Sequence, residues 1–321
     1  MIDDIVAHVA RAPGAERLLV ARPLAYCLYN NRGGSTSSIL VLGFAPGEKC
    51  PAVAVKLSRD RERASREHAT LTRLAPRLPE RVPNPYLTGE CHGWTFLAME
   101  GMAGGPIAAA RVPRFLTSIV EVVVALHREG DEGPMSQGDV AAEIEAPLRT
   151  FERDYAGGRT ALEGLCRAVG IQLASLRDVP LPRVAQHGDF TLGNLLARPS
   201  GAVVVVDWEE FGLVRMPGYD LVALFSNLPR HNPFADRKLG KAYFGALAAY
   251  AVATRLDPRW LKVLVPVGMM RFVLFCAAEG REEAFERTLA RLESLARRGP
   301  EVLDMLSGGA PGAPAGTRRP W

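Results

Sequence analysis

The stretch HGDFTLGNLLARPSGAVVVVDWE, residues 187–209, decides the fold of this chain. Asn194 precedes a short apolar run, the turn sequence PSGA follows, and a second apolar run ends at Asp207. This order predicts a β-hairpin in which Arg198 pairs with Val203. Counting back along the antiparallel ladder from that pair places Asn194 opposite Asp207. Opposed residues have Cβ atoms about 4.5–5.5 Å apart, so two oxygen ligands are expected to converge on one point.

The polar residues of this stretch suit the transfer of a phosphoryl group. Mg²⁺ prefers oxygen ligands and is usually held by one or two protein carboxylates together with substrate phosphates, which fits Asn194 and Asp207. Asp189 is expected at the mouth of the same loop, where it can accept a hydroxyl proton. An Asx-turn pair is the alternative for the Asp189–Asn194 spacing taken alone. The longer pattern, which ends in Asp-Trp-Glu, favours catalysis.

A second pair of charged residues lies upstream. Lys56 ends the apolar run AVAVK, where an inward lysine is costly unless it meets an anion. A helix is expected from about Arg61 to Leu78, and Glu67 shares its apolar face with Leu71, Leu74 and Leu78. Lys56 and Glu67 are therefore predicted to form an ion pair of the kind that holds nucleotide phosphates. The alternatives are an outward lysine at a strand end and a solvated glutamate at the edge of the helix face.

Two β-branched runs, Ser38–Phe44 and Ala52–Leu57, predict a hairpin around Lys56. A Gly- and Ser-rich turn precedes them, and the backbone N–H groups of Gly33, Gly34 and Ser35 are candidates to bind phosphates. An ordinary hairpin loop is the alternative, because the turn matches neither G-x-G-x-x-G nor the P-loop spacing.

The composition of the chain changes near residue 105. Strand-like runs dominate before this point, and long helical patterns dominate after about Val112. Glycines and a proline between Glu100 and Pro106 end the apolar strand predicted at Trp94–Met99. The change indicates that a small β-rich part precedes a larger helical part.

We therefore expect an α+β fold with two lobes, and the family resemblance described below implies that this fold is protein-kinase-like. Residues 1–105 are predicted to form a β-rich nucleotide-binding lobe. Residues 106–306 are predicted to form a mainly helical lobe with the catalytic loop and the acceptor site. The Gly- and Pro-rich tail at 307–321 is expected to be disordered.

Composition limits the function classes. The chain has 321 residues, of which 48% are apolar and 23% charged, as in globular proteins. The net charge of +4 comes from 39 basic and 35 acidic residues without a concentrated basic run, so no nucleic-acid partner is predicted. The five cysteines are widely spaced and form no CxxC motif. This pattern predicts neither a disulfide framework nor a zinc site and fits a reducing cytoplasm.

Two features argue against secretion and membrane insertion. The N-terminus lacks the basic segment and long apolar run of a signal peptide. The apolar stretches Val263–Met270 and Val273–Ala278 are separated by Arg271 and are shorter than the roughly 20 residues that span a bilayer. They are predicted to form a core helix, and the protein is expected to be cytoplasmic, without a membrane partner. The sequence indicates no oligomeric state.

Three motifs together resemble those of the aminoglycoside phosphotransferase and choline kinase superfamily, relatives of the protein kinases. His187-Gly-Asp189-x4-Asn194 looks like the catalytic loop of that superfamily, and Val206–Glu209 looks like its metal-binding motif. Val53–Lys56 looks like its nucleotide-lysine strand. The resemblance covers roughly residues 24–224.

The resemblance implies a role for each matched residue. Asp189 would be the catalytic base, with Asn194 and Asp207 as ligands of Mg²⁺. Lys56 would contact the α- and β-phosphates, with Glu67 as its partner.

The resemblance also extends to residues around this centre. Glu100 to Met102 would be the hinge that meets the adenine. His187 would brace the catalytic loop, and Asp220 would hydrogen-bond to it from a helix start. Glu209 either lines the metal site or caps the strand end.

The expected activity is transfer of the γ-phosphate of ATP or GTP to a hydroxyl of a small molecule, such as a sugar, an amino sugar or another hydroxylated metabolite. Asp139, Glu143 and Glu145 are candidates to meet a cationic acceptor, and a solvated helix start is the alternative. The aromatic share of 7% gives no sign of an aromatic cage for choline. A catalytically silent nucleotide-binding regulatory module of the same fold is the alternative function.

Overall fold

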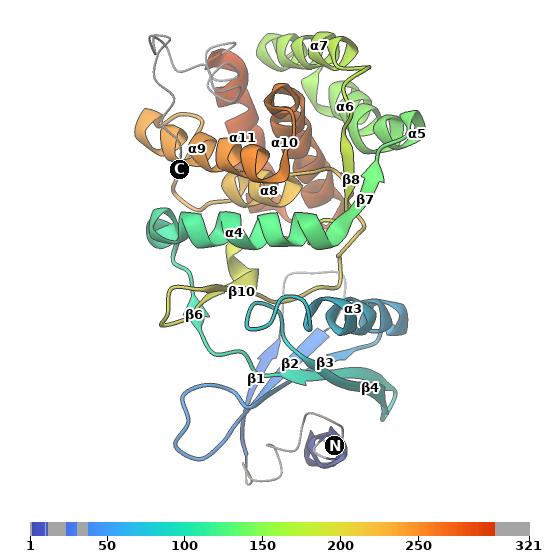
Figure 1. The fold of residues 1–321 in the computed structure, drawn as a ribbon, viewed down its shortest axis with the longest axis vertical. Coiled ribbons are helices and arrows are strands. Elements are labelled where there is room, and N and C mark those ends of the chain that lie inside the picture. The colour runs from blue at the N-terminus through green and yellow to red at the C-terminus, as the bar shows by residue number, and fades with distance from the viewer. Residues whose placement is uncertain (1, 10, 12–23, 31–37, 299–321) are drawn as a thin grey trace.

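The computed structural model describes residues 2–9, 11, 24–30 and 38–298. A small part built on a β-sheet and a larger helical part lie one after the other along the long axis of the molecule (Figure 1). The predicted two-lobed, kinase-like α+β fold is confirmed. The tail predicted to be disordered lies outside the described residues.

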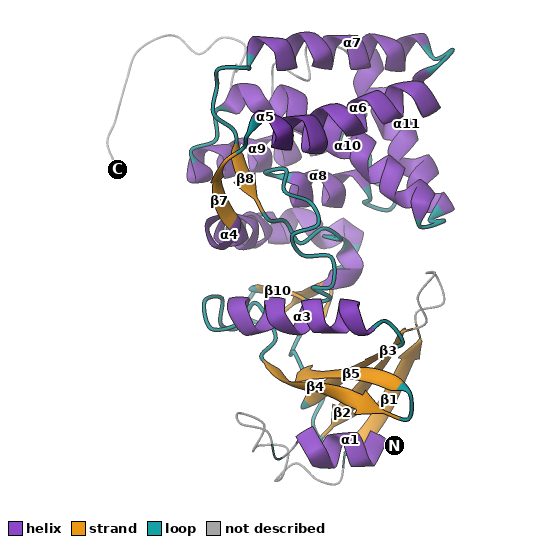
Figure 2. Ribbon diagram, turned by 90° about the vertical axis from the view of Figure 1, so that its right-hand side faces the viewer, coloured by secondary structure: helices purple, strands orange, loops and turns teal. Residues whose placement is uncertain are grey.

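One antiparallel sheet forms the small lobe, with the strands in the spatial order β1-β2-β3-β5-β4. The strands are β1 (Ala25–Asn30), β2 (Ser38–Phe44), β3 (Val53–Ser58), β4 (Pro85–Cys91) and β5 (Trp94–Glu100). The hairpin predicted from the two β-branched runs is the β2–β3 pair, in which Leu40 lies opposite Lys56. The helices α1 (Ile2–Val9) and α3 (Arg61–Leu74) cover opposite faces of the sheet (Figure 2).

Alternation along β3 decides which way Lys56 points. The apolar side chains of Val53, Val55 and Leu57 pack in one cluster with Ile5 of α1. Ala54 instead belongs to the core that contains Leu71 of α3. Because successive side chains of a strand face opposite sides of the sheet, Lys56 shares the α3 face with Ala54. That face is the one turned toward the helical lobe (Figure 2).

The helix α3 begins at a side-chain cap and ends earlier than predicted. The Asp60 carboxylate accepts a hydrogen bond of 3.0 Å from the backbone N–H of Arg63. The helix ends at Leu74 and not at Leu78. Pro76 explains the difference, because it lacks the N–H that would continue the helix, although Ala75 before it still has helical dihedral angles.

The large lobe is mainly helical. Its helices are α4 (Val112–Gly130), α5 (Gln137–Val140), α6 (Ala146–Phe151), α7 (Thr160–Ser175), α8 (Tyr219–Ser226), α9 (Arg237–Thr254), α10 (Leu261–Ala278) and α11 (Glu282–Arg298). Two short strands, β7 (Asp131–Pro134) and β8 (Pro182–Val184), pair beside them. α4 crosses the molecule on the side of the large lobe that faces the small lobe (Figure 1).

A three-stranded sheet lies between α4 and the small lobe. It consists of β6 (Gly105–Pro106), β9 (Leu195–Ala197) and β10 (Val203–Val205), in the order β10-β9-β6. The predicted strands of the 187–209 stretch are β9 and β10. The segment that leaves the small lobe therefore pairs directly with the hairpin that follows the catalytic loop.

The apolar helix α10 is a core element of the large lobe. The segment Pro258–Ala278 is long and apolar enough to cross a membrane, yet 67% of its most apolar window is buried inside the protein. A helix that is apolar all around suits the centre of a large lobe. This burial agrees with the core helix predicted from the stretches on either side of Arg271.

Candidate active site

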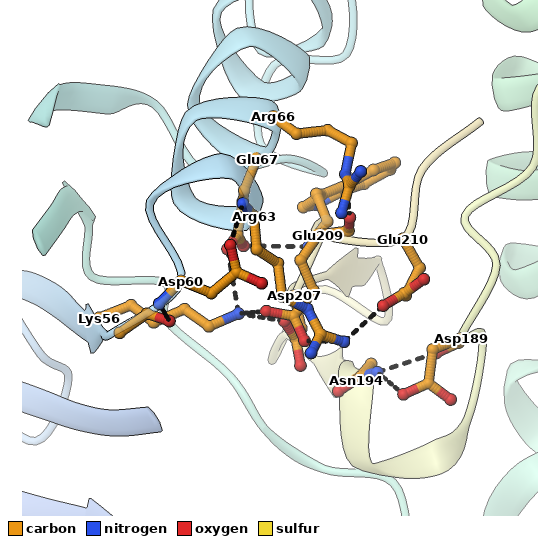
Figure 3. A network of polar contacts seen from close by, with 12 residues as sticks. Lys56, Asp60, Arg63, Arg66, Glu67, Asp189, Asn194, Asp207, Glu209 and Glu210 are labelled. Atoms are coloured by element: carbon orange, nitrogen blue, oxygen red, sulfur yellow. Dashed lines mark hydrogen bonds and ion pairs between the residues drawn. The ribbon is translucent and has the colours of Figure 1, made fainter. Parts of the chain in front are cut away.

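Lys56 lies at the centre of a cluster of carboxylates (Figure 3). Its Nζ atom is 3.0 Å from Glu67 Oε2, and it is 2.5 Å from both Asp207 Oδ1 and Glu209 Oε2. The predicted ion pair with Glu67 is present, and the Glu67 side chain is 1% exposed. Burial alone would lower the pKa of Lys56, but attraction to the three carboxylates outweighs burial and raises this pKa. Lys56 is therefore a permanent cation.

Glu67 also connects α3 to the Asp-Trp-Glu segment. Its second oxygen, Oε1, accepts a hydrogen bond of 3.0 Å from the backbone N–H of Trp208. Burial raises the pKa of Glu67, and Lys56 opposes this effect. The inward direction predicted from the helix face is correct. One glutamate thus fixes both the lysine of the small lobe and the strand end of the large lobe.

The carboxylates of Glu67, Asp207 and Glu209 each present an oxygen within 4.8 Å of the others. Arg63 Nη2 also approaches this group, at 2.9 Å from Glu209 and in a shorter contact with Glu210. Four carboxylates and two cations leave a formal charge of −2. Burial would raise the pKa of Asp207, but Lys56 outweighs burial and lowers it, so Asp207 stays ionised. The centre combines oxygen ligands with unbalanced negative charge.

Asp189 and Asn194 contact each other in the catalytic loop. Asn194 Nδ2 donates to the backbone oxygen of Asp189 at 2.8 Å and to its Oδ2 at 3.3 Å. A single 3₁₀ turn over Leu192–Asn194 brings the two residues together. The amide nitrogen is used in holding Asp189, which leaves the amide oxygen of Asn194 as a ligand atom (Figure 3).

The register of the hairpin differs from the prediction by one residue. Val203 pairs with Ala197 and not with Arg198. The Arg198 N–H donates to Ala202 O at 2.9 Å, so the turn has three residues in place of four. Gly201 makes this possible because its φ of 87° lies in the left-handed region that glycine adopts without cost.

Asn194 consequently lies opposite Val206, whose N–H donates to Asn194 O at 3.0 Å. The prediction that Asn194 faces Asp207 across the ladder is wrong. Asp207 has a φ of 67°, so the chain leaves the extended conformation there, and strand alternation no longer sets its side-chain direction. A left-handed non-glycine residue costs about 1–2 kcal/mol. The chain bears this strain at the residue that reaches Lys56.

A buried carboxylate holds the start of the catalytic loop. Asp220 is fully buried and accepts hydrogen bonds from the backbone N–H groups of His187, at 2.9 Å, and Gly188, at 3.1 Å. The predicted link between Asp220 and His187 thus runs through the backbone and not through the imidazole ring. The ring nitrogen Nε2 lies 3.1 Å from Val206 O, which connects the loop to the far strand of the hairpin. Burial raises the pKa of Asp220.

Arg281 was not predicted and contacts the proposed base. Its Nη1 atom lies 3.0 Å from Asp189 Oδ1, and its guanidinium group lies 4.7 Å from the centre of the Phe275 ring. Arg281 lies in the turn between α10 and α11, 92 residues after Asp189. No local motif signals such a contact, because only the folding of the helical lobe creates it. Arg63 and Glu210 were missed for the same reason.

The predicted nucleotide residues outside this centre have separate locations. Met102 is buried, and Glu100 Oε2 accepts a hydrogen bond of 2.7 Å from Asn84 Nδ2 at the end of β5. Gly33, Gly34 and Ser35 lie outside the described residues. The predicted hinge Glu100–Met102 begins at the last residue of β5, the strand next to the one that carries Lys56.

The three acidic residues suggested for a cationic acceptor have partners within the protein. Asp139 forms a capping box with Ser136 and is held near Arg183. Glu143 lies 2.9 Å from Arg271, and Glu145 lies 3.0 Å from Arg149. These contacts favour the alternative of structural and solvated acidic residues around a helix start.

One protein-family model and a number of solved structures match this chain. The model of the phosphotransferase enzyme family matches residues 47–262. This match extends from the β2–β3 connection to the first turn of α10 and includes every described residue of the carboxylate cluster and the catalytic loop. No curated protein matches the chain in sequence.

Three solved structures illustrate the likeness in fold. An aminoglycoside phosphotransferase from Alicyclobacillus acidocaldarius is 16% identical, with a TM-score of 0.56, and the match covers 90% of this chain and 93% of that one. A choline/ethanolamine kinase family protein from Mesorhizobium loti is 17% identical, with a TM-score of 0.52 and coverage of 96% and 99%. A thermostable mutant of aminoglycoside phosphotransferase APH(4)-Ia, in a complex with AMP-PNP and hygromycin B, is 16% identical, with a TM-score of 0.55 and coverage of 88% and 98%.

Proposed function

Because the chain belongs to the phosphotransferase enzyme family, we propose that it is a small-molecule kinase that transfers the γ-phosphate of ATP or GTP to a hydroxyl group. One observation supports the proposal: Asn194, which holds Asp189, pairs with Val206, the residue before Asp207 in the Lys56-centred carboxylate cluster that joins both lobes. Phosphoryl transfer requires a cation for the nucleotide phosphates and a carboxylate for the acceptor hydroxyl. Lys56 is the candidate for the first role and Asp189 for the second.

The residues of the centre fit Mg²⁺, which kinases of this family use with their nucleotide. The fit rests on the donor set, because Glu67, Asp207 and Glu209 supply hard oxygen atoms around a formal excess of negative charge. We assign the metal to Asp207 and Asn194, with Glu209 at the edge of the site. When bound, Mg²⁺ would neutralise the charge of the nucleotide phosphates. Glu67 is the structural partner of Lys56, since it also holds the Trp208 N–H.

The remaining chemistry belongs to residues of the chain. Lys56 binds the nucleotide phosphates once they replace Asp207 and Glu209 as its partners. The Asp189 carboxylate accepts the proton of the acceptor hydroxyl, and the hydroxyl oxygen forms a bond to the γ-phosphorus. The bond from that phosphorus to the bridging oxygen breaks, and the nucleoside diphosphate leaves with the electron pair. Asn194 keeps Asp189 oriented through its two hydrogen bonds.

Two variants test the proposal in one assay. In the presence of a transferable alcohol, Asp189→Ala is expected to abolish release of nucleoside diphosphate while nucleotide affinity remains near the wild-type value. Asp207→Ala is expected to weaken binding of the Mg–nucleotide complex as well. Calorimetry with Mg–AMP-PNP measures the affinity, and a coupled assay measures diphosphate release. Near-normal turnover by Asp189→Ala would show that Asp189 is not the base.

A further inference from the structure

A cavity of about 430 Å³ opens beside the catalytic loop. Gly188, next to Asp189, and Glu210, three residues after Asp207, form one wall. Elements of the helical lobe form the rest, so the cavity is lined by the large lobe and not by the small lobe that carries Lys56. Its volume lies within the range of about 300–1,000 Å³ that small-molecule sites occupy. The position is where a hydroxyl acceptor would reach the proposed base.

The lining of this cavity is mainly apolar. Helix α6 and the segment before it contribute small residues, and α10 contributes larger ones: Ala142, Ala146, Pro147, Leu274 and Phe275. Leu213 and Val214 complete the wall next to the catalytic loop. An acceptor that fills this space would contact hydrocarbon over most of its surface.

Every carboxylate at the cavity already has an arginine partner. Glu210 pairs with Arg63 and Asp189 pairs with Arg281 at 3.0 Å. Arg271, which lines the cavity, pairs with Glu143 at 2.9 Å. A cationic acceptor would have to break one of these pairs, and separating a partly buried ion pair is costly.

The aromatic residues that line the cavity are Phe275 and Tyr219, so at most one uncovered ring remains to meet a cation. The face of Phe275 is already covered by the Arg281 guanidinium group, 4.7 Å from the ring centre. A quaternary ammonium group is usually bound by several open aromatic faces. The lining therefore offers a cationic acceptor neither a carboxylate without an arginine partner nor several open aromatic faces.

We infer that the acceptor is an uncharged alcohol with a largely apolar body, and that this cavity binds it. The inference rests on the proposed kinase function, because it assigns the substrate class of the same site. It separates this chain from the proteins of similar fold, whose names refer to aminoglycosides, choline and ethanolamine.

A matched pair of alcohols tests the inference. 3,3-Dimethylbutan-1-ol has the shape of choline, with a carbon in place of the charged nitrogen. With Mg–ATP, kcat/KM for the neutral alcohol is expected to exceed that for choline at least tenfold. Along the series from 1-propanol to 1-octanol, kcat/KM should rise about fourfold per methylene until the cavity is filled, which corresponds to about 0.8 kcal/mol per buried methylene.

The variant Arg271→Gln removes the cationic partner of Glu143, whose carboxylate then keeps the hydrogen bond from the Arg215 N–H and has no arginine to balance its charge against a cationic acceptor. The preference for 3,3-dimethylbutan-1-ol over choline should fall at least fivefold in this variant. Arg259→Gln is the matched control, because Arg259 forms an exposed ion pair with Asp257 away from the cavity. The control should keep the wild-type preference.

Saturation-transfer NMR of the wild-type protein with Mg–AMP-PNP separates this inference from the kinase function. The cavity assignment is supported if the neutral alcohol binds and choline does not. If in addition neither Mg–ATP nor Mg–GTP yields a phosphorylated product, the kinase function is refuted. The inference is refuted, and the kinase function stays intact, if the protein phosphorylates choline or hygromycin B with a kcat/KM as high as that for the neutral alcohols. Failure of every neutral alcohol to bind would also refute the inference.

Discussion

Gly188 is the most restricted position of the catalytic loop, and Gly188→Ala should disturb both stability and activity. Its φ of 91° lies in the left-handed region, where an alanine costs about 1–2 kcal/mol. A Cβ atom at Gly188 would also lie 2.8 Å from the Glu210 carbonyl oxygen and 2.9 Å from Glu210 Cβ. Relief of such a clash costs about 1–3 kcal/mol. Together the two effects predict a loss of about 2–4 kcal/mol, after the small gain from a stiffer unfolded chain.

Two other glycines of the same region separate these causes. Gly201 also has a positive φ, of 87°, but a Cβ atom there would meet no atom within 4 Å. Gly201→Ala should therefore lose only about 1 kcal/mol, from the backbone conformation alone. Gly193 has no positive φ, and its Cβ atom would lie 3.8 Å from Thr191 Oγ1. Gly193→Ala should change stability by less than about 0.5 kcal/mol.

Urea unfolding of the three variants measures these values, and diphosphate release measures the consequence for Asp189, the next residue. Gly188→Ala should lower kcat at least tenfold, because the Glu210 contact pushes the start of the catalytic loop away. Gly201→Ala should keep kcat within about twofold. If Gly188→Ala were no less stable than Gly201→Ala, the close approach of the loop to Glu210 would be wrong.

Three further predictions concern charge and burial. Lys56→Met should weaken Mg–nucleotide binding at least tenfold in calorimetry. The variant removes the cation that the phosphates bind and leaves the buried Glu67 without its cationic partner. Unchanged affinity would contradict the role of Lys56. Arg281→Gln should lower kcat about tenfold, which corresponds to an activation free energy higher by about 1.4 kcal/mol, with little change in nucleotide KM. The reason is that the variant frees the Asp189 side chain. A change in KM alone would contradict this role of Arg281. Burial raises the pKa of the Cys166 thiol to about 11 and that of the Cys276 thiol to about 12. Neither thiol should therefore react with Ellman's reagent at pH 8 until the protein unfolds. Rapid reaction of both thiols in the folded protein would contradict their burial.

The period of apolar residues and the spacing of polar residues in the sequence were enough to predict the strands and the helix that carry the candidate site residues. The 3.6-residue period of α3 placed Glu67 on the buried face, and this inward glutamate favoured an inward Lys56 over an outward lysine at a strand end. Their contact followed from the rule that a buried charge needs a partner. These inferences depend on local structure, which propensities and periods describe well.

Contacts that depend on the exact course of the chain were not predictable in this way. The register of the β9–β10 hairpin is set by Gly201, and its shift by one residue moves Asn194 from Asp207 to Val206. The left-handed conformation of Asp207 has no signal in its residue type. Arg281 reaches Asp189 only because α10 and α11 pack as they do. Sequence periods carry no information about such long-range placement.

The proposed kinase function depends above all on Asp189, which is expected to activate an acceptor hydroxyl for attack on the nucleotide. The most direct measurement follows the label from γ-³²P-ATP and γ-³²P-GTP in the presence of a panel of neutral and cationic alcohols. The wild-type protein should place the label on an alcohol oxygen, and Asp189→Ala should produce no labelled alcohol although it still binds Mg–AMP-PNP. Tight Mg–nucleotide binding by the wild-type protein with no labelled alcohol from either nucleotide would contradict the claim and favour a silent nucleotide-binding module.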